Sequence, residues 1–401
     1  MLKKTLYGVG IFLFMCLNSA QSLQRLPQAR AEEVGMSSQR LARLDGIIQD
    51  ALEQKHFPGA VVMVGRQGRI VWRKAYGDRQ WIPERRPMQL SLLFDLASLT
   101  KPLATTTSIM LLVEQGKIRL WDKVTDFFPE FVPYIDETGE PGEDVRLWHL
   151  LTHTSGLRPY IPNPEIEENV GIPCTLESLV KYIGATEKLN PPGEEFHYSD
   201  LGFILLGYVV EKVSEESLAD YAARHVFAPL KMDHTFFKPS VEDRSLCVPT
   251  EKVEDQLLQG VVHDPRARLL GGVAGHAGLF SNADDLAVFA QMLLNKGEFQ
   301  GVRLLSPLTV ERMTEIQTQV AYAGRGLGWD LDSDYSTNGG DLFGPASFGH
   351  TGYTGTSFWV DPETESFVIF LTNRVHPDDS GEVATWRSRV ANVVAAAIID
   401  K

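Results

Sequence analysis

The sequence predicts an α/β protein of the α+β type, with one antiparallel sheet built from both chain ends, flanking helices and a mostly helical inserted domain. Three observations support this prediction. Strand-like segments lie toward both ends of the chain, a largely helical block separates them, and a helix accompanies the strands at each end. Terminal strands around a helical middle indicate one sheet with an insertion. We place the sheet part at about residues 33–97 and 300–401 and the helical part at about 98–299.

The N-terminal elements follow from apolar spacing. Residues 38–55 carry an apolar stripe at helical spacing, and Pro58-Gly59 ends this helix. Two strands are expected at 60–64 and 70–76, joined by a glycine-containing turn that favours a hairpin.

The remaining elements are also predicted from the spacing of their apolar residues, which is helical in some segments and strand-like in others. Helices are expected at 98–115, 143–152, 175–183, 200–213, 215–227 and 283–295, strands at 357–360 and 367–373, and a final helix at 382–399.

A separate segment precedes the predicted fold. Residues 1–22 combine two early lysines with an apolar run from Leu6 to Leu17 and a small-residue end, as a secretory signal does. We therefore expect residues 23–401 to be an exported domain, periplasmic or secreted. It would contact a membrane only through this segment, if the segment stays uncleaved.

Composition narrows the class of protein. The 401 residues are 43% hydrophobic and 22% charged, which is typical of a soluble globular chain. A net charge of -14 disfavours nucleic acid as a partner. Three cysteines cannot build a disulfide framework. Cys174 and Cys247 could pair in an oxidising compartment or serve as small buried apolar groups.

The first segment that can carry chemistry contains Ser98 and Lys101. Three residues apart on a helix, they share a face, and a nearby base is what a serine hydroxyl needs to become a nucleophile. Ser98 would lie in the first helical turn, where amide N–H groups are unpaired. A second Ser-x-x-Lys, Ser178 to Lys181, lies in an ordinary amphipathic helix, and we assign it no role.

Two later segments add polar groups. Tyr198-Ser199-Asp200 opens an apolar helix, and a phenol beside an ammonium can transfer protons. Phe348 to Thr356 contains His350, Thr351 and Gly352 ahead of a strand, where glycines permit close backbone approach and the polar side chains can bind a carboxylate.

In this order, Ser-x-x-Lys, Tyr-x-Asp and His-Thr-Gly resemble the motifs of the serine β-lactamase and penicillin-binding-protein superfamily, on its class C side. The resemblance spans about residues 33–400 and includes the stretches 150–157 and 272–281. These stretches look most like low-molecular-mass D-alanyl-D-alanine carboxypeptidases.

The resemblance implies a role for each matching residue. Ser98 matches the acylated nucleophile, Lys101 its partner amine, and Tyr198 the tyrosine that passes protons. His350-Thr351-Gly352 stands where most β-lactamases have Lys-Thr-Gly, and the backbone N–H groups of Ser98 and Tyr353 match the oxyanion hole.

One position departs from the family pattern. Asp200 stands where the family usually has asparagine, and an ionised carboxylate cannot donate a hydrogen bond. We expect Asp200 to pair with Lys101, to keep that amine charged and to shift the general-base role toward Tyr198.

The sequence therefore predicts a serine hydrolase without a cofactor, acting on small molecules or peptides. A D-alanyl-D-alanine peptide end is the leading substrate, and β-lactams, short esters or non-turnover binding of cell-wall peptides are the alternatives. No metal site is expected, because His149 and His153 lack further ligands nearby. Residues 324–328 are predicted to be a glycine-rich loop before Trp329.

Overall fold

The computed structural model describes residues 25–400, so the predicted export segment at 1–22 lies outside the described residues. Among the described helices, none combines the length and the apolar character needed to cross a membrane.

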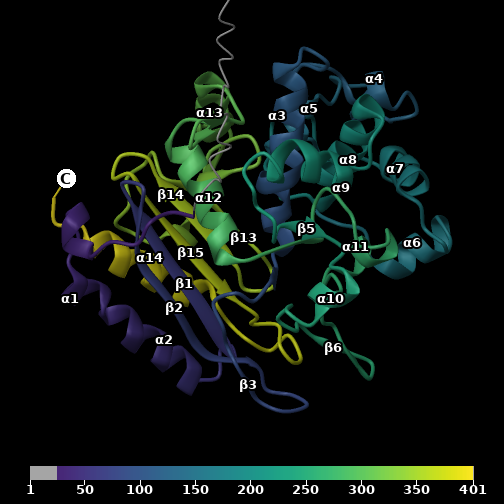
Figure 1. Ribbon diagram of the computed structural model, residues 1–401. Coiled ribbons are helices and arrows are strands. Elements are labelled where there is room, and N and C mark those ends of the chain that lie inside the picture. The colour runs from purple at the N-terminus through teal and green to yellow at the C-terminus, as the bar shows by residue number, and fades with distance from the viewer. Residues whose placement is uncertain (1–24, 401) are drawn as a thin grey trace, which may run out of the picture.

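The central feature of the described chain is an antiparallel sheet of eight strands (Figure 1). In spatial order the strands are β11 (Ala323–Arg325), β12 (Asp330–Ser333), β13 (Phe348–Thr351), β14 (Ser357–Asp361), β15 (Ser366–Thr372), β1 (Gly59–Arg66), β2 (Arg69–Gln80) and β3 (Arg86–Pro87). Small strand pairs and triplets are formed by β4 (Phe94–Asp95), β8 (Leu279–Ser281) and β5 (Phe236–Phe237), by β6 (Lys252–Val253) and β7 (Gln256–Leu257), and by β9 (Glu298–Phe299) and β10 (Val302–Arg303).

Strands from the two chain ends meet at the middle of this sheet. The hairpin of β1 and β2 turns at Gln67-Gly68, and both residues adopt positive φ, 48° and 73°, as a tight hairpin turn requires. On its other edge β1 pairs with β15, with Val62 beside Phe370. The predicted fold class is therefore confirmed.

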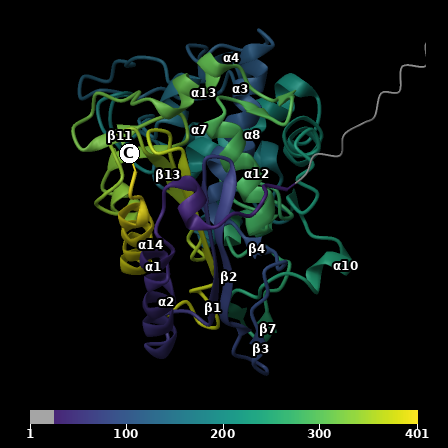
Figure 2. The same cartoon turned by 60° about the vertical axis from the view of Figure 1, so that its left-hand side comes forward.

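Each face of the sheet packs on a different set of helices because side chains alternate along a strand. Val62 and Phe370 point into a core shared with α1 (Ser38–Leu41), α2 (Arg43–Glu53) and α14 (Ala384–Ala397). Their neighbours Val61 and Ile369 point into the larger core that contains α12 (Ala283–Leu294) and the helical part. Figure 2 shows this layered order, with α2 and α14 on one side of the sheet and α12 on the other.

The helical part lies beside the sheet and supplies half of the site described below (Figure 1). Its helices are η2 (Ala97–Leu99), η3 (Lys101–Thr106), α3 (Thr107–Glu114), α4 (Val124–Phe127), α5 (Leu147–Leu151), α6 (Asn163–Asn169), α7 (Leu176–Ala185), α8 (Asp200–Ser214), α9 (Leu218–Ala222), η4 (Ala223–Phe227), α10 (Val241–Arg244) and α11 (Pro265–Leu269). Outside it lie η1 (Ala31–Val34), α13 (Pro307–Thr314) and η5 (Ser336–Gly339).

Several predicted helices are shorter or divided. The helix expected at 143–152 is confined to α5, and the one expected at 215–227 consists of α9 followed by the π-helical η4. The segment 98–115 is helical throughout but begins as a 3-10 turn and a π-helical turn before α3. Pro102 lacks an N–H and cannot complete regular α-helical bonding near the start of this segment.

The prediction of a loop at 324–328 is partly wrong. Gly324 and Arg325 belong to strand β11 at the sheet edge, where β11 pairs with β12. This edge strand is only three residues long, which is too short to produce a periodic signal.

The cysteines at 174 and 247 are free and buried. Cys174 belongs to the large core, whereas Cys247 packs with Leu93 and Phe280. Burial raises the pKa of Cys247 to about 12, so this thiol is unreactive at neutral pH.

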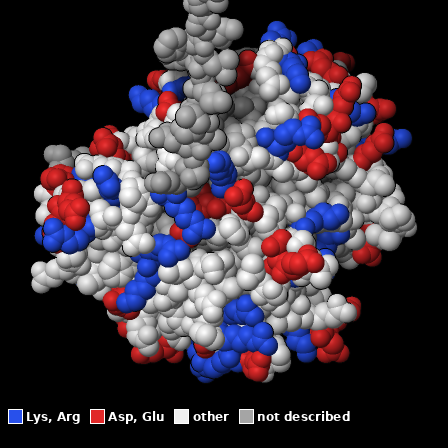
Figure 3. Space-filling view, in the orientation of Figure 1, with Lys and Arg blue, Asp and Glu red and all other residues white. Residues whose placement is uncertain are grey.

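Charged side chains are mixed on the face shown in Figure 3. Lysines and arginines form small groups with acidic neighbours, and no single positive field covers that face.

Candidate active site

Ser98 lies on a tight turn directly after β4. Ala97, just before it, has a φ of 46°, a backbone conformation that residues other than glycine rarely adopt. The buried carboxylate of Asp95 stabilises this turn by accepting hydrogen bonds from the N–H of Ala97 at 2.8 Å and from the N–H of His263 at 2.6 Å. The turn therefore presents Ser98 in a fixed orientation at the start of a helical segment.

Lys101 is completely buried behind Ser98. Its Nζ donates to Ser98 Oγ at 2.9 Å, to Asp200 Oδ1 at 2.9 Å and to the carbonyl oxygen of His276 at 3.3 Å. Three acceptors match the three protons of an ammonium. Burial alone would lower the pKa of Lys101, but the Asp200 carboxylate and the Tyr198 oxygen outweigh it and raise the pKa. The structure thus brings Asp200 and Lys101 together as the sequence predicted.

Asp200 is the first residue of α8, where a negative charge is favoured by the helix dipole. Burial works to raise the pKa of its carboxyl, but the Lys101 ammonium and the other nearby cations lower it below its ordinary value. Asp200 is therefore ionised and accepts hydrogen bonds, as the sequence analysis expected.

Tyr198 is held over Lys101 by the stretch around His153. The N–H of Ser199 donates to Nδ1 of His153 at 2.9 Å, and the His153 ring stacks on Tyr198 with centroids 4.4 Å apart. Lys101 Nζ lies 4.8 Å from the Tyr198 ring centroid. The segment at 150–157 therefore positions the tyrosine.

The segment with His350, Thr351 and Gly352 is fastened to the Ser98 turn. Thr354 Oγ1 donates to the carbonyl of Asp95 at 2.7 Å, and Thr356 Oγ1 to that of Leu96 at 3.2 Å. A Cβ on Gly352 would lie 2.3 Å from the Leu96 oxygen, so only glycine permits this approach. The predicted residues of all three motifs are thus brought to one place.

Ser98 and Tyr198 line a cavity of about 340 Å³ together with the end of β13. This cavity contains Arg325, which sequence reasoning missed because its segment was predicted to be a loop. Arg325 is 1% exposed and pairs through Nη1 with Asp330 at 3.1 Å. Its Nε and Nη2 are buried and have no partner among the described residues, so two donors remain for a ligand.

His350 does not supply the permanent charge of the lysine that most β-lactamases have at this position. Burial, reinforced by the charges of Arg325 and Lys101, lowers the pKa of His350 well below its ordinary value. Its Nδ1 donates to the carbonyl of Thr351 at 2.8 Å, which leaves a lone pair on Nε2 of the neutral ring. Arg325 is thus a permanent positive charge beside His350, and Arg374 and Arg387 line the same cavity.

A second cavity of about 540 Å³ adjoins Ser98 and Tyr198, and is lined by Asp200, Asp264 and His276 among others. Tyr353 lines both cavities with a side chain that is 56% exposed and donates to Asp379 at 2.7 Å. Ser98 therefore lies between two cavities.

The comparisons with known proteins agree with this arrangement. The family model described as "Beta-lactamase" matches residues 44–392. The chain is 32% identical over 375 residues to an N-acetylmuramyl-L-alanine amidase of Bacillus subtilis (strain 168), covering 86% of this chain and 83% of that protein. It is 29% identical over 402 residues to a protein of Escherichia coli (strain K12) named "Putative D-alanyl-D-alanine carboxypeptidase", covering 94% and 92%.

Solved structures show the same fold. EstCE1, described as a hydrolase with promiscuous acyltransferase activity, superposes with a TM-score of 0.72 at 26% identity, over 89% of this chain and 99% of that one. The octameric penicillin-binding protein homologue from Pyrococcus abyssi superposes with a TM-score of 0.69 at 25% identity, over 89% and 77%. Sequence, fold and family match together show that the chain belongs to the beta-lactamase family and is a serine hydrolase with a class C-like, penicillin-binding-protein fold.

Proposed function

We propose that the chain hydrolyses D-alanyl-D-alanine ends of cell-wall peptides through an acyl-enzyme on Ser98. The observation that carries this proposal is the contact of Ser98 Oγ with the Lys101 ammonium, beside a cavity in which Arg325 keeps unpartnered donors. The names of the relatives support the same substrate class.

In the proposed reaction Tyr198 is the proton carrier. The Lys101 ammonium already donates to Ser98 Oγ, so the proposed reaction starts with Tyr198 as the phenolate, which accepts the hydroxyl proton of Ser98 as Oγ attacks the carbonyl. The N–H groups of Ser98 and Tyr353 stabilise the oxyanion. Tyr198 then returns the proton to the leaving amine, and a water repeats the sequence to release the peptide acid and free Ser98.

The basic cavity favours a leaving group that carries a free carboxylate. In a D-alanyl-D-alanine end, the carboxylate lies one residue from the bond that is broken, within reach of a guanidinium beside Ser98. A carboxylate that reaches this guanidinium would make charge-assisted hydrogen bonds with Nε and Nη2, which are buried and have no hydrogen-bond partner among the described residues. Thr351, at the end of β13, lines the same cavity.

An amidase acting between muramic acid and L-alanine is the second candidate, and the 32% identical Bacillus relative favours it. In that substrate the leaving L-alanine continues as a peptide and has no free carboxylate next to the bond. The two candidates therefore differ in what the Arg325 cavity receives.

One substrate distinguishes these candidates. Muramyl pentapeptide, incubated with the chain lacking residues 1–22 and followed by mass spectrometry, should lose one D-alanine and keep its sugar. Release of the whole peptide from the sugar would instead establish the amidase. Nitrocefin and p-nitrophenyl acetate, run beside it, report β-lactam and ester hydrolysis, and labelling without turnover would identify a binding protein.

Arg325→Gln should lower kcat/KM for the pentapeptide about 10- to 100-fold, the worth of hydrogen bonds to a charged group. The neutral ester p-nitrophenyl acetate should lose several-fold less. Because His350 stays neutral, the pentapeptide and the ester should also show the same pH dependence between pH 6 and 8 (roughly the range in which an unperturbed histidine titrates). Equal losses on both substrates would contradict carboxylate binding by Arg325.

Asp200→Asn should move the alkaline limb of the kcat/KM profile to lower pH. Burial works to lower the pKa of Lys101 and the Asp200 carboxylate helps to raise it, so removal of that carboxylate lets the ammonium lose its proton at a lower pH. The restored amide donor should also raise nitrocefin turnover. An unchanged profile for p-nitrophenyl acetate would show that the pair does not set the charge of Lys101.

We further propose that the protein is exported to the periplasm or secreted. The lysines and the apolar run within residues 1–22 support this, and a cell-wall substrate lies outside the cytoplasmic membrane. N-terminal sequencing of the protein recovered from culture fractions tests both the compartment and the cleavage.

A further inference from the structure

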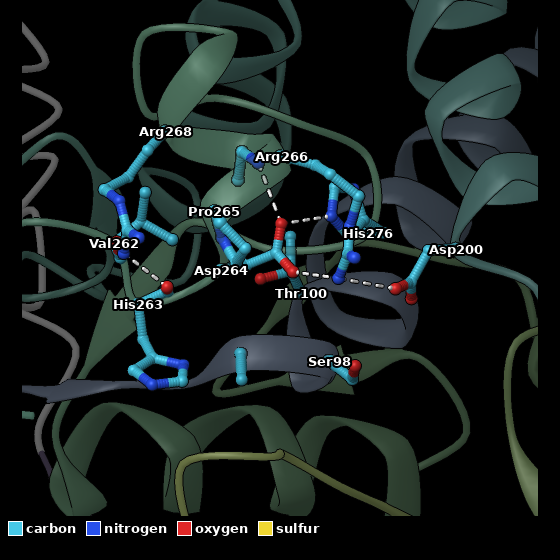
Figure 4. A network of polar contacts seen from close by, with 12 residues as sticks. Ser98, Thr100, Asp200, Val262, His263, Asp264, Pro265, Arg266, Arg268 and His276 are labelled. Atoms are coloured by element: carbon cyan, nitrogen blue, oxygen red, sulfur yellow. Dashed lines mark hydrogen bonds and ion pairs between the residues drawn. The ribbon is translucent and has the colours of Figure 1, made fainter. Parts of the chain in front are cut away.

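A network of polar contacts continues from Asp200 along the second cavity, which Ser98 also lines (Figure 4). Arg266 Nη2 lies 3.4 Å from Asp200 Oδ2 and 2.5 Å from Asp264 Oδ2. The other oxygen of Asp264 contacts His276 Nε2 at 2.8 Å. Asp264 also caps α11 by accepting from the N–H of Ala267 at 2.8 Å. Both oxygens of Asp264 are thus in use, and its orientation is fixed.

His276 closes this network because it contacts both ends. Its ring binds Asp264, while its carbonyl oxygen accepts from Lys101 Nζ at 3.3 Å. The loop that carries His276 is fixed by its neighbour Gly275, whose carbonyl accepts from Thr105 Oγ1 at 2.6 Å. A Cβ on Gly275 would lie 1.9 Å from the Phe203 oxygen, so the loop is packed directly on α8.

We propose that Asp264, Arg266 and His276 are positioning residues that hold Asp200 in place as the charged partner of Lys101. The proposal rests on acyl-enzyme chemistry at Ser98 and not on which acyl group is transferred. Asp200 Oδ1 faces Lys101 and Oδ2 faces Arg266, so the two cations hold the carboxylate from opposite oxygens. Without Arg266 the carboxylate could rotate, and Lys101 would lose the acceptor that orients it toward Ser98.

The charges within this network balance. Lys101 and Arg266 are cationic, and Asp200 and Asp264 are anionic. His276 Nε2 lies against Asp264 Oδ1 at 2.8 Å, and its buried Nδ1 has no hydrogen-bond partner among the described residues. Asp200, Asp264 and His276 lie close enough to hold a metal ion, but the ammonium and the guanidinium already pair with both carboxylates. The cluster is therefore better suited to orienting a lysine than to binding a metal.

The test is a double-mutant cycle on Asp200. Arg266→Gln and Asp264→Asn should each lower kcat for p-nitrophenyl acetate about 10- to 100-fold, the usual cost of a small misplacement of a reacting group, with KM nearly unchanged. Both should slow fluorophosphonate labelling of Ser98 by similar factors. In an Asp200→Asn background the same substitutions should have little further effect, because the carboxylate that they position is gone. Arg266→Lys should recover part of the loss.

The matched control is Asp284→Asn, a buried carboxylate that pairs with Arg73 at 2.7 Å outside both cavities. It should destabilise the protein without changing kcat. Arg266 is 15% exposed, so Arg266→Gln should fold even if Asp264→Asn does not, and it then decides the question. Full additivity with Asp200→Asn, or unchanged kcat, would overturn the proposed positioning role. Failure of the wild-type protein to label Ser98 would instead overturn the proposed function.

Discussion

Ser98→Ala should abolish turnover of every substrate and all labelling by a fluorophosphonate or a fluorescent penicillin. The substitution removes Oγ, the only atom at this position that can form the acyl bond, and leaves Lys101 paired with Asp200. Loss of a nucleophile typically costs more than about 10³-fold in kcat, because the remaining groups cannot replace it. Mass spectrometry of the labelled protein should place the adduct on the peptide that contains residue 98.

Ser178→Ala is the matched control, because Ser178 also precedes a lysine by three residues. Its hydroxyl donates to the carbonyl of Thr175 at 2.9 Å at the start of α7, and it lines neither cavity at Ser98. This variant should keep its turnover and its labelling. Labelling that persists in Ser98→Ala would show that a different residue is the nucleophile.

Tyr198→Phe should lower kcat about 10²- to 10⁴-fold, the contribution expected of a general acid–base group. The substitution removes only the hydroxyl, so the ring keeps its stacking on His153 and its position over Lys101. Acylation and deacylation should both slow, because the same oxygen carries the proton in each step. Rapid mixing with p-nitrophenyl acetate measures the burst and the steady state separately.

Tyr221→Phe controls for loss of a buried hydroxyl elsewhere. Tyr221 is 2% exposed in the large core, and its oxygen accepts from Gln115 at 3.4 Å. This variant should retain wild-type kcat. A Tyr198→Phe enzyme with full activity would leave Lys101 as the base and would contradict the ammonium form described above.

The sequence predicts the fold best where a regular apolar pattern extends over many residues. The hairpin at 60–76 is recognisable because its strands are apolar and end at a glycine turn, and α8 because fifteen residues keep a helical pattern. Strands β11 and β12 are not predictable in this way. They have three and four residues, and in β12 only Leu331 belongs to the large core, while Asp330 lines the cavity.

The residues of the site also differ in how well the sequence predicts them. Ser98, Lys101, Tyr198 and Asp200 lie in short segments whose residue types already indicate chemistry, and the structure brings them together. Arg325 and Asp264 have no such local signal, because an isolated arginine or aspartate resembles any surface charge. Their importance comes from where the fold places them: Arg325 is buried and pairs with Asp330 beside the cavity, and Asp264 holds Arg266, which contacts Asp200 from 66 residues away in the chain.

The pairing of β1 with β15 has a consequence for the order in which the enzyme becomes active. The Ser98 turn is fastened by Thr354 and Thr356, which belong to the hairpin between β13 and β14 near the end of the chain. The sheet cannot close until that hairpin arrives, and such distant pairings form late because a long loop must be ordered first. A chain that becomes available for folding from its N-terminus onward therefore remains inactive until nearly all of its residues are present. For the proposed exported hydrolase, activity would therefore arise only after the last strands have reached the compartment in which the chain folds.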